Sequence, residues 1–199
     1  MSDERKGKSQ LIEELAQLRR RVVQFEQLEI QYKRDEEALR AAAFIDELTG
    51  LYNRKGFLTL GQQQINIGNR TKHQVLLLFM DLDNLKIIND SFGHATGDLA
   101  LVDFAGILKR TFRESDVISR WGGDEFVVVA LANENGSADM LAGRLEEAIM
   151  LHNLHQERPY KLSLGLGVAV CDTEHTCDIS ELLHRADEAM YRAKANKLI

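Results

Sequence analysis

A glycine pair separates two apolar runs in Val117-Ile-Ser-Arg-Trp-Gly-Gly-Asp-Glu-Phe-Val-Val-Val-Ala-Leu131. β-Branched and aromatic residues favour strands, and two glycines between such runs are typical of a tight turn. The sequence therefore predicts a β-hairpin with arms over 117–120 and 125–131. Asp124 lies directly after the glycines, at the turn.

The residues on either side of this hairpin predict further helices and strands. Val75-Leu-Leu-Leu-Phe-Met-Asp81 is an apolar run that reads as a buried strand ending in a carboxylate. A helix is predicted to begin near Arg54, and others cover 85–90, 98–112, 137–156 and 179–194, with another strand over 160–170. This order favours an α+β fold in which helices pack on a mostly antiparallel sheet.

The first forty-odd residues have a different character, with no Gly or Pro from Leu11 to Ala43. Steps of alternately four and three residues select a mainly apolar series: Leu11, Leu15, Leu18, Val22, Phe25, Glu29, Tyr32, Glu36, Leu39 and Ala43. This heptad pattern, which we call the seam, is typical of paired helices. We expect residues 1–43 to form a parallel dimeric coiled coil, with a helix roughly 50 Å long.

Two charged residues interrupt the seam. Glu29 and Glu36 occupy positions where apolar side chains are expected, and Leu28 and Ile30 offer apolar alternatives beside the first of them. The seam is therefore expected to change register there. A single solvated helix is the alternative that the pattern leaves open.

The charge is distributed unevenly along the chain, whose formal net charge is −6. Residues 1–40 hold nine basic and nine acidic side chains, so the deficit lies in 41–199, with sixteen basic and twenty-two acidic. An acidic globular part argues against binding of duplex nucleic acid, which needs a surplus of Lys and Arg. It leaves room for carboxylates that hold metal ions.

The cysteines and the apolar runs indicate the compartment. Cys171 and Cys177 are too few for a disulfide framework, and we expect free thiols in a reducing compartment. The first residues lack the apolar stretch of a signal peptide, and the longest strongly apolar run, 75–80, is too short to span a membrane. We therefore expect a soluble cytoplasmic protein without membrane insertion.

Asp81 and Asp124 are the first candidates for chemistry. Carboxylates at the ends of neighbouring strands can hold one hard cation, and Mg²⁺ prefers a few carboxylates plus phosphate oxygens. Gly122 and Gly123 have no side chains, so a nucleotide could approach the backbone closely. Taken alone, each feature is more often a plain turn.

The surrounding motifs change that assessment. Arg120-Trp-Gly-Gly-Asp-Glu-Phe126 resembles the signature loop of the GGDEF family, the diguanylate cyclases. The resemblance extends over about 44–199 in order and spacing, through these further segments: Asp46-Glu-Leu-Thr-Gly-Leu-Tyr-Asn-Arg54, Phe79-Met-Asp-Leu-Asp-Asn-Leu-Lys-Ile-Ile-Asn-Asp90, Phe92-Gly-His-Ala-Thr-Gly-Asp98, Ser163-Leu-Gly165 and Ala186-Asp-Glu-Ala-Met-Tyr-Arg-Ala-Lys194.

This resemblance implies a fold, a reaction and an assembly. The fold is a sheet surrounded by helices, similar to nucleotidyl cyclases and polymerase palms, in a catalytic domain over 44–199. The reaction condenses two GTP into cyclic di-GMP and two pyrophosphates. Each domain binds one GTP, so a homodimer is expected, and the seam supplies a means to form it. An upstream sensory domain or a docking partner is expected to deliver the signal.

The resemblance also assigns roles residue by residue. Asp81 and Asp124, with the main-chain carbonyl of Leu82, are expected to hold two Mg²⁺ or Mn²⁺ ions per GTP site. Glu125 is expected to assist at these metals and to activate the ribose 3′-hydroxyl. The expected nucleotide contacts are Asn89 and Asp98 for the guanine edge, Lys86 and Lys194 with the backbone amides of 82–86 for the triphosphate, and Gly122 and Gly123 for close backbone approach.

A second site is implied by Arg113-Glu-Ser-Asp116, which ends shortly before the glycine pair. An RxxD motif in this place resembles the family's inhibitory site, where the cyclic di-GMP product binds. Arginine can stack on guanine and hydrogen-bond its edge, while aspartate accepts from its N–H groups. Arg144 on the following helix is expected to complete the site. A salt bridge at the end of a helix is the alternative reading.

Other polar residues are expected to be structural. Asp83 and Asp90 are interpreted as capping or turn groups, and His152 and His155 as solvated histidines. Leu85 stands where the family usually has phenylalanine. The family usually continues after Lys194 with Gly and a basic residue, whereas this chain has Ala195-Asn-Lys-Leu-Ile199, so a phosphate contact is in doubt.

Two alternative functions stay open. One is a non-catalytic receptor that binds cyclic di-GMP at Arg113 and Asp116, although such proteins usually have a degraded signature loop. The other is a related cyclase whose product contains adenine. Asp98 argues against the latter, because a carboxylate matches the N1–H and amine of guanine, whereas N1 of adenine is an acceptor.

Overall fold

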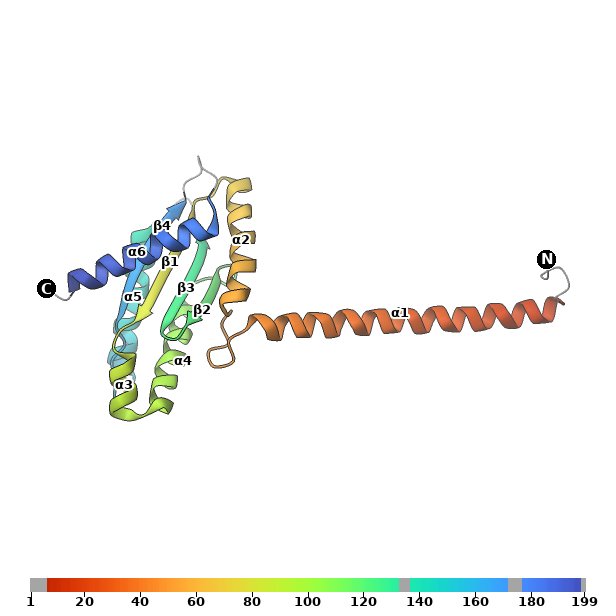
Figure 1. The fold of residues 1–199 in the computed structure, drawn as a ribbon, viewed down its shortest axis with the longest axis horizontal. Helices are drawn as coiled ribbons and strands as arrows, with labels where there is room; N and C mark the ends of the chain where they lie inside the picture. Colours follow the sequence, from red (N-terminus) through yellow and green to blue (C-terminus); the bar gives the residue numbers. More distant parts are fainter. Residues whose placement is uncertain (1–6, 133–136, 172–176, 198–199) are drawn as a thin grey trace. The chain divides into compact units, whose positions relative to one another are not determined.

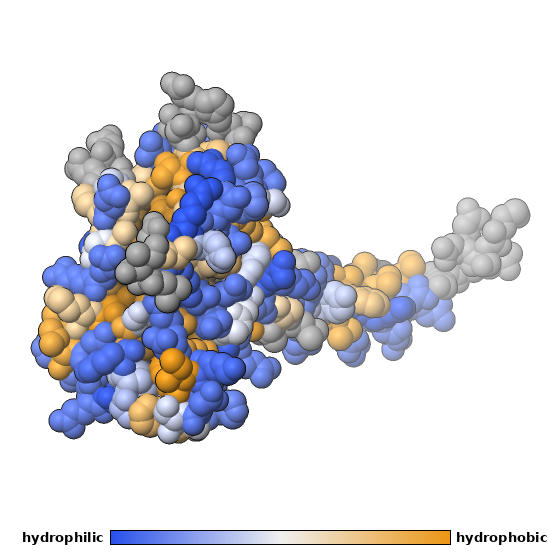
Figure 2. Space-filling view, turned by 60° about the vertical axis from the view of Figure 1, so that its left-hand side comes forward, coloured by the Kyte–Doolittle hydropathy of each residue, from blue (hydrophilic) through white to orange (hydrophobic). Residues whose placement is uncertain are grey.

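The computed structural model describes residues 7–132, 137–171 and 177–197 of the chain. The chain divides into two compact units, Met1–Ala43 and Phe44–Ile199. The first consists mainly of the helix α1 (Lys8–Phe44), whose 37 residues contain the whole predicted seam from Leu11 to Ala43. Its large apolar side chains from Leu11 to Tyr32 are exposed. Figure 2 shows apolar and polar side chains gathered on different sides of this helix.

The second unit contains a four-stranded antiparallel sheet in the order β2-β3-β1-β4. Its strands are β1 (Val75–Leu82), β2 (Val117–Gly122), β3 (Glu125–Leu131) and β4 (Leu164–Cys171). β2 and β3 form the predicted hairpin, and β1 lies between β3 and β4. β1 is buried over almost its whole length, as expected for an apolar central strand. The predicted α+β fold with an antiparallel sheet is confirmed.

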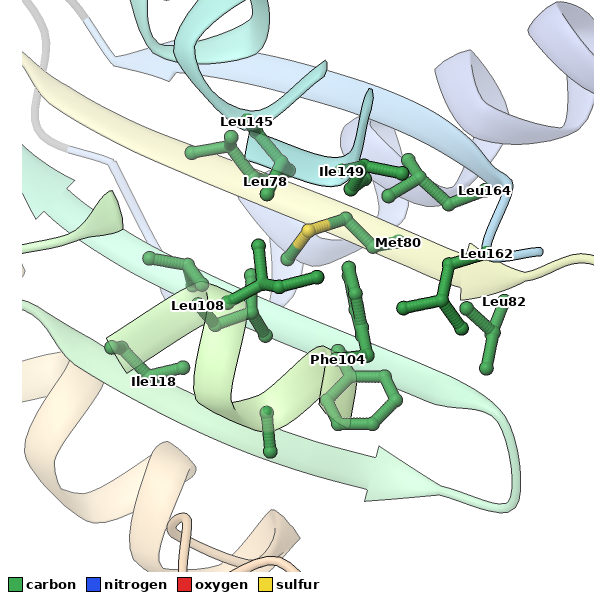
Figure 3. Close-up of a cluster of buried hydrophobic side chains, with 14 of the residues drawn as sticks. Leu78, Met80, Leu82, Phe104, Leu108, Ile118, Leu145, Ile149, Leu162 and Leu164 are labelled. Atoms are coloured by element: carbon green, nitrogen blue, oxygen red, sulfur yellow. The ribbon is translucent and has the colours of Figure 1, made fainter. Parts of the chain in front are cut away.

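Helices cover both faces of the sheet (Figure 1). They are α2 (Arg54–Thr71), α3 (Leu85–Phe92), α4 (His94–Thr111), α5 (Ala138–His155) and α6 (Ile179–Lys197). Because side chains alternate along β1, Leu78 and Met80 join a core with α4 and α5, shown in Figure 3. Leu77 and Phe79 join the opposite core with α2 and α6. The sheet therefore has a hydrophobic layer on each face, and polar side chains can gather where β1 ends.

Two boundaries differ by four residues from the sequence prediction. α4 begins at His94 rather than at Asp98, because Gly93 alone makes the turn with a φ of 85°. β4 begins at Leu164 rather than at 160. The side-chain amide of Asn153 donates to the Leu162 carbonyl at 2.7 Å and accepts from the Leu162 N–H at 2.8 Å. Leu162 therefore has no strand partner.

The free-thiol prediction is wrong in this structure. Cys171 and Cys177 form a disulfide, because the end of β4 and the residues before α6 bring their Cα atoms to 6.0 Å. The cytoplasmic location stays a prediction without this support. Among the described residues, no helix combines the length and the apolar character that a membrane crossing requires.

Candidate active site

Strand pairing brings Asp81 and the glycine turn together. Asp81 lies opposite Glu125 in the β1–β3 ladder and opposite Gly165 in the β1–β4 ladder. Directly after it, the N–H of Leu82 donates to the carbonyl of Asp124 at 3.0 Å. Two strand ends thus place the three acidic side chains of the prediction at one edge of the sheet.

This edge opens into a groove of about 540 Å³, which we call the carboxylate groove. Five residues singled out from the sequence line it together: Asp81, Leu82, Lys86, Asp124 and Lys194. The Leu82 side chain is buried in the core, so only its backbone is available to the groove. Residues from β1, the hairpin, α3 and α6 therefore meet in one polar depression.

Lys194 crosses from α6 into this groove and pairs with Asp81. Its ammonium also lies 3.3 Å from Asp83. Burial works to lower the pKa of Lys194, but the hydrogen bonds and negative charges of Asp81 and Asp83 outweigh it, so the pKa is raised. The ammonium is therefore firmly charged while it is held by two carboxylates.

Glu125 lies among several other acidic side chains. Burial raises the pKa of the Glu125 carboxyl, and the charges of Asp81 and Asp124 raise it further. Asp187 acts in the same direction, and Arg54 in the opposite one. A nearby cation would relieve this repulsion, and deprotonated Glu125 could then accept a proton.

The groove fits a divalent cation that shares its coordination with a substrate. Within the described parts of the chain, no group of three or more His, Cys, Asp or Glu side chains is arranged to hold a metal by itself. Mg²⁺ typically takes one or two carboxylates and completes its shell with water and phosphate oxygens. Asp81 already holds a cation, the ammonium of Lys194, which shows that this carboxylate accepts positive charge.

The predicted phosphate and guanine groups flank the groove. α3 begins at Leu85 without a side-chain hydrogen bond capping it among the described residues, so its first amides suit an anion. The backbone N–H groups of Leu82 and Asp83 already donate within the protein. Of the backbone amides of 82–86 that are predicted to contact the triphosphate, only those of 84–86 therefore remain available. Asn89 and exposed Asp98 lie on α3 and α4, outside the residues that line the groove.

Gly97 explains how Asn89 reaches this position. A Cβ at Gly97 would overlap the side-chain amide of Asn89, so the glycine lets α3 and α4 approach closely there. Asn89 is thereby held against the first turn of α4, one residue before Asp98. The structure brings these two groups to neighbouring positions by packing rather than by a direct hydrogen bond.

The glycine turn is exposed and anchored from one side. Gly123 has a φ of 52°, which favours glycine, and added Cβ atoms at Gly122 and Gly123 would meet open space. The guanidinium of Arg120 donates to the carbonyl of Gly123 at 2.9 and 2.8 Å. Arg120 also pairs with Asp46 at 3.3 Å. The segment 46–54, which carries part of the family resemblance, therefore supports the turn.

The predicted inhibitory residues lie around a second pocket of about 370 Å³, lined by Arg113 and Asp116. Asp116 accepts from the N–H of Arg113 at 2.8 Å. Burial raises the pKa of Asp116 against the opposing influence of Arg113 and of the Arg144 charge. Arg144 is thus near enough to act on Asp116, while its own guanidinium donates to the carbonyl of Thr111.

Two groups have contacts that their predicted structural roles do not include. Asp83 lies in the turn after β1, as expected, but it also accepts from the hydroxyl of Ser163 at 2.5 Å and faces Lys194. His152 was expected to be solvated, but its side chain is largely buried 3.6 Å from Asp103. His155 is exposed, as expected.

Comparison with known proteins identifies the family of this domain. The family model described as "Diguanylate cyclase, GGDEF domain" matches residues 43–198. Diguanylate cyclase DgcP of Escherichia coli is 36% identical over 189 residues, which cover 94% of this chain and 55% of that protein. The chain thus spans about half the length of this curated relative.

Solved structures agree with the fold. A microbial GGDEF domain studied for its interaction with cyclic di-GMP has a TM-score of 0.69 at 35% identity, over 79% of this chain and 94% of that one. The coiled coil and GGDEF domain of DgcB from Caulobacter crescentus, in complex with cyclic di-GMP, has a TM-score of 0.76. It covers 90% of this chain and 95% of that one, but at 24% identity it shows the fold alone. On the family match and the identity to DgcP, the chain belongs to the GGDEF family of diguanylate cyclase domains.

Proposed function

We propose that this protein condenses two GTP molecules into cyclic di-GMP and releases two pyrophosphates. In each of two steps, a ribose 3′-hydroxyl attacks the α-phosphorus of the other GTP and pyrophosphate leaves. The observation that carries the proposal is the carboxylate groove, where Asp81 and Asp124 meet Lys86 and Lys194 beside the exposed glycine turn. Carboxylates and lysines in one groove suit metal-assisted reaction of a triphosphate.

In this proposal Asp81, Asp124 and the carbonyl of Leu82 hold the divalent cations, Mg²⁺ or Mn²⁺, two per site. When bound, these ions supply positive charge that stabilises the attacking and leaving oxygens. The protein contributes by fixing the carboxylates, because Asp81 and Asp124 sit at the ends of two paired strands. Rigid placement of this kind is the main contribution of proteins to phosphoryl transfer.

Glu125 is proposed to accept the proton of the attacking 3′-hydroxyl. Burial raises the pKa of its carboxyl in the protein alone, and the charges of Asp81 and Asp124 raise it further, although Glu125 itself is not among the residues that line the groove. Cations bound beside it would favour its charged form, in which it can act as a base. Arg54, which lies 4.6 Å from the Trp121 ring centroid, adds positive charge near Glu125.

The two lysines of the groove and several residues outside its lining are proposed to bind and select GTP. Lys86 and Lys194, with the first amides of α3, would contact the triphosphate. Asn89 and Asp98 would read the guanine edge from the adjoining helices, the carboxylate accepting from the ring N–H and the amine. Gly122 and Gly123 leave the backbone open, so the nucleotide can pass close to the turn.

Catalysis in this scheme needs two copies of the domain, because each binds one GTP. The proposed domains are 1–43, a parallel dimeric coiled coil, and 44–199, the catalytic domain. The exposed seam on α1 supports the homodimer, since a row of apolar side chains in water favours burial against a second helix. The lone-helix alternative leaves that apolar surface without a partner.

Product inhibition is proposed at Arg113, Asp116 and Arg144. The pocket beside them is separate from the carboxylate groove in its lining residues and offers both a guanidinium and a carboxylate. These groups match the acceptor and donor edges of guanine, respectively. Cyclic di-GMP bound there would slow its own formation as it accumulates.

One experiment separates this proposal from the two alternatives. The protein is incubated with GTP, ATP or both in the presence of Mg²⁺, and the nucleotide products are identified by mass spectrometry. A cyclase specific for guanine yields cyclic di-GMP from GTP alone and no adenine-containing product. Binding of cyclic di-GMP without any turnover would indicate a receptor, and a mixed product would overturn the guanine-reading role of Asp98.

A further inference from the structure

Lys194 holds an unusual place for a group expected to bind phosphate. Its ammonium pairs with Asp81, the side chain proposed as a metal ligand, and only 28% of the lysine side chain is exposed. The same ammonium lies 3.3 Å from Asp83. A cation that binds Asp81 must therefore displace an internal cation first.

Asp83 is itself fixed from the neighbouring strand. Its carboxylate accepts from the hydroxyl of Ser163 at 2.5 Å, and its N–H donates to the Ser163 carbonyl at 2.8 Å. Two bonds to one residue hold both the backbone and the side chain of Asp83. The orientation of this carboxylate is thus set by Ser163 and does not depend on Lys194.

Gly165 makes room for the lysine. It lies opposite Asp81 in the β1–β4 ladder, and an added Cβ would overlap the aliphatic part of the Lys194 side chain, with Cδ at 2.9 Å and other carbons closer. The lysine therefore lies flat across the backbone of β4 on its way to Asp81. Any larger residue at position 165 would push it aside.

We propose that Lys194 competes with the divalent cation for Asp81, and that Asp83, oriented by Ser163, retains the ammonium in the groove once Asp81 is released. This inference rests on the proposed metal and GTP site and adds Asp83 and Ser163 to it as positioning residues. The displaced ammonium remains beside the substrate phosphates instead of moving into solvent. Metal alone then binds weakly, whereas metal with GTP gives both cations an anionic partner.

The first test measures Mn²⁺ binding to the full chain without nucleotide, from the electron paramagnetic resonance signal of free Mn²⁺. Lys194→Met keeps the length of the stem but removes the charge, and is expected to tighten Mn²⁺ binding about five-fold or more. Gly165→Ala keeps the charge but displaces the stem, so it should change the affinity in the same direction. This readout is independent of catalysis.

Lys86→Met is the matched control. Lys86 lines the same groove and is exposed, and no ion pair of its side chain is found among the described residues. Its removal should alter Mn²⁺ affinity by less than about two-fold, because an exposed charge is screened by solvent. If the parent protein and Lys194→Met bind Mn²⁺ with equal affinity, this inference is wrong but the proposed metal site is not. If none of these proteins binds Mn²⁺, both the proposed metal site and this inference are wrong.

The second test asks whether Asp83 acts through Lys194. Binding of a GTP analogue with a methylene group between the α- and β-phosphorus atoms is measured with Mn²⁺ present. Asp83→Asn and Ser163→Ala should each weaken binding about three- to ten-fold in the parent protein, and should have little further effect in the Lys194→Met background. A purely structural role would instead weaken binding equally in both backgrounds, and that result would contradict the proposal.

Discussion

Phe25 and Phe57 are the same side chain in two opposite environments. Phe25 on α1 is 63% exposed, whereas Phe57 on α2 is fully buried between the sheet and α6. Residues 44–199 bury their large side chains against their own strands and helices. The described part of residues 1–43 has no such layer, and its large apolar side chains from Leu11 to Tyr32 face solvent in the single chain.

The difference separates two kinds of stability. Residues 44–199, the proposed catalytic unit, are stabilised by burial within one chain, so their groove can form in a monomer. The helix α1 can bury its seam only against another helix, so its stability depends on protein concentration. A change in residues 44–199 should therefore alter folding or chemistry, and a change on the seam should alter assembly.

The largest effect is expected from Glu125→Gln. This substitution removes the proposed base but keeps its shape, and should lower the rate of cyclic di-GMP formation by about 10²–10⁴. Dimer formation and thermal unfolding should stay as in the parent protein. Product can be followed by chromatography and assembly by sedimentation. Normal turnover by this variant would remove the proposed role of Glu125.

The second prediction compares the two phenylalanines directly. Phe57→Ala should reduce the free energy of unfolding of residues 44–199 by about 3–5 kcal/mol, because it opens a cavity in a packed core. Phe25→Ala should leave that free energy unchanged and weaken the dimer. Urea unfolding and sedimentation equilibrium measure the two quantities. If Phe25→Ala destabilises the catalytic unit as much as Phe57→Ala does, the division between the units is wrong.

The third prediction concerns Arg113, which the catalytic unit exposes beside its second pocket. Arg113→Ala should raise the concentration of cyclic di-GMP needed for half inhibition about ten-fold or more, because a charged hydrogen bond to the product is lost. The initial rate without product should be little changed. Inhibition curves of the parent and the variant that coincide would leave Arg113 as a surface residue at a helix end.

The smallest effect is expected from a buried ionic cluster away from the groove. Asp103 accepts from Arg158 at 2.8 Å and from the hydroxyl of Tyr160 at 2.7 Å. Burial tends to raise the pKa of Asp103, but these bonds outweigh it and the pKa is lowered. Asp103→Asn should reduce the free energy of unfolding by about 1 kcal/mol at pH 7.

The dependence on pH follows from the sign of that shift. A lowered pKa in the folded state contributes stability above the unfolded value of about 3.9, and this stability is lost as the pH falls through the folded value. The parent and Asp103→Asn should therefore converge in acid. Glu29→Gln on α1 is the control, because Glu29 and Lys33 pair at 2.8 Å with both side chains largely exposed. It should give no measurable change in unfolding, and a parent–Asp103→Asn difference that persists in acid would contradict the assignment.

Much of the fold could be predicted because the apolar pattern is strong. β3 coincides with its predicted range, and Ser137 caps α5 where the helix was expected to begin. The errors arose where a single residue decides. Gly93 alone makes the turn before α4, so this helix begins four residues earlier than predicted, and the amide of Asn153 takes the backbone groups of Leu162 that would otherwise extend β4.

The candidate site was predictable where its residues follow a motif, and not where they depend on register. Asp81, Asp124 and Lys194 meet in the groove, although 113 residues separate the first from the last along the chain. The partnership of Asp83 with Ser163 follows from the pairing of β1 with β4, which the sequence does not specify. The disulfide likewise depends on the close approach of Cys171, at the end of β4, to Cys177, just before α6.

We propose that two copies of residues 44–199, joined by the seam, make cyclic di-GMP. The most direct test is the rate of cyclic di-GMP formation from GTP and Mg²⁺ per mole of protein, measured over a wide range of protein concentration. We expect this specific rate to rise with concentration and then reach a plateau as the dimer forms. A specific rate independent of concentration in a protein that sediments as a monomer throughout, or no cyclic di-GMP at any concentration, would contradict the claim.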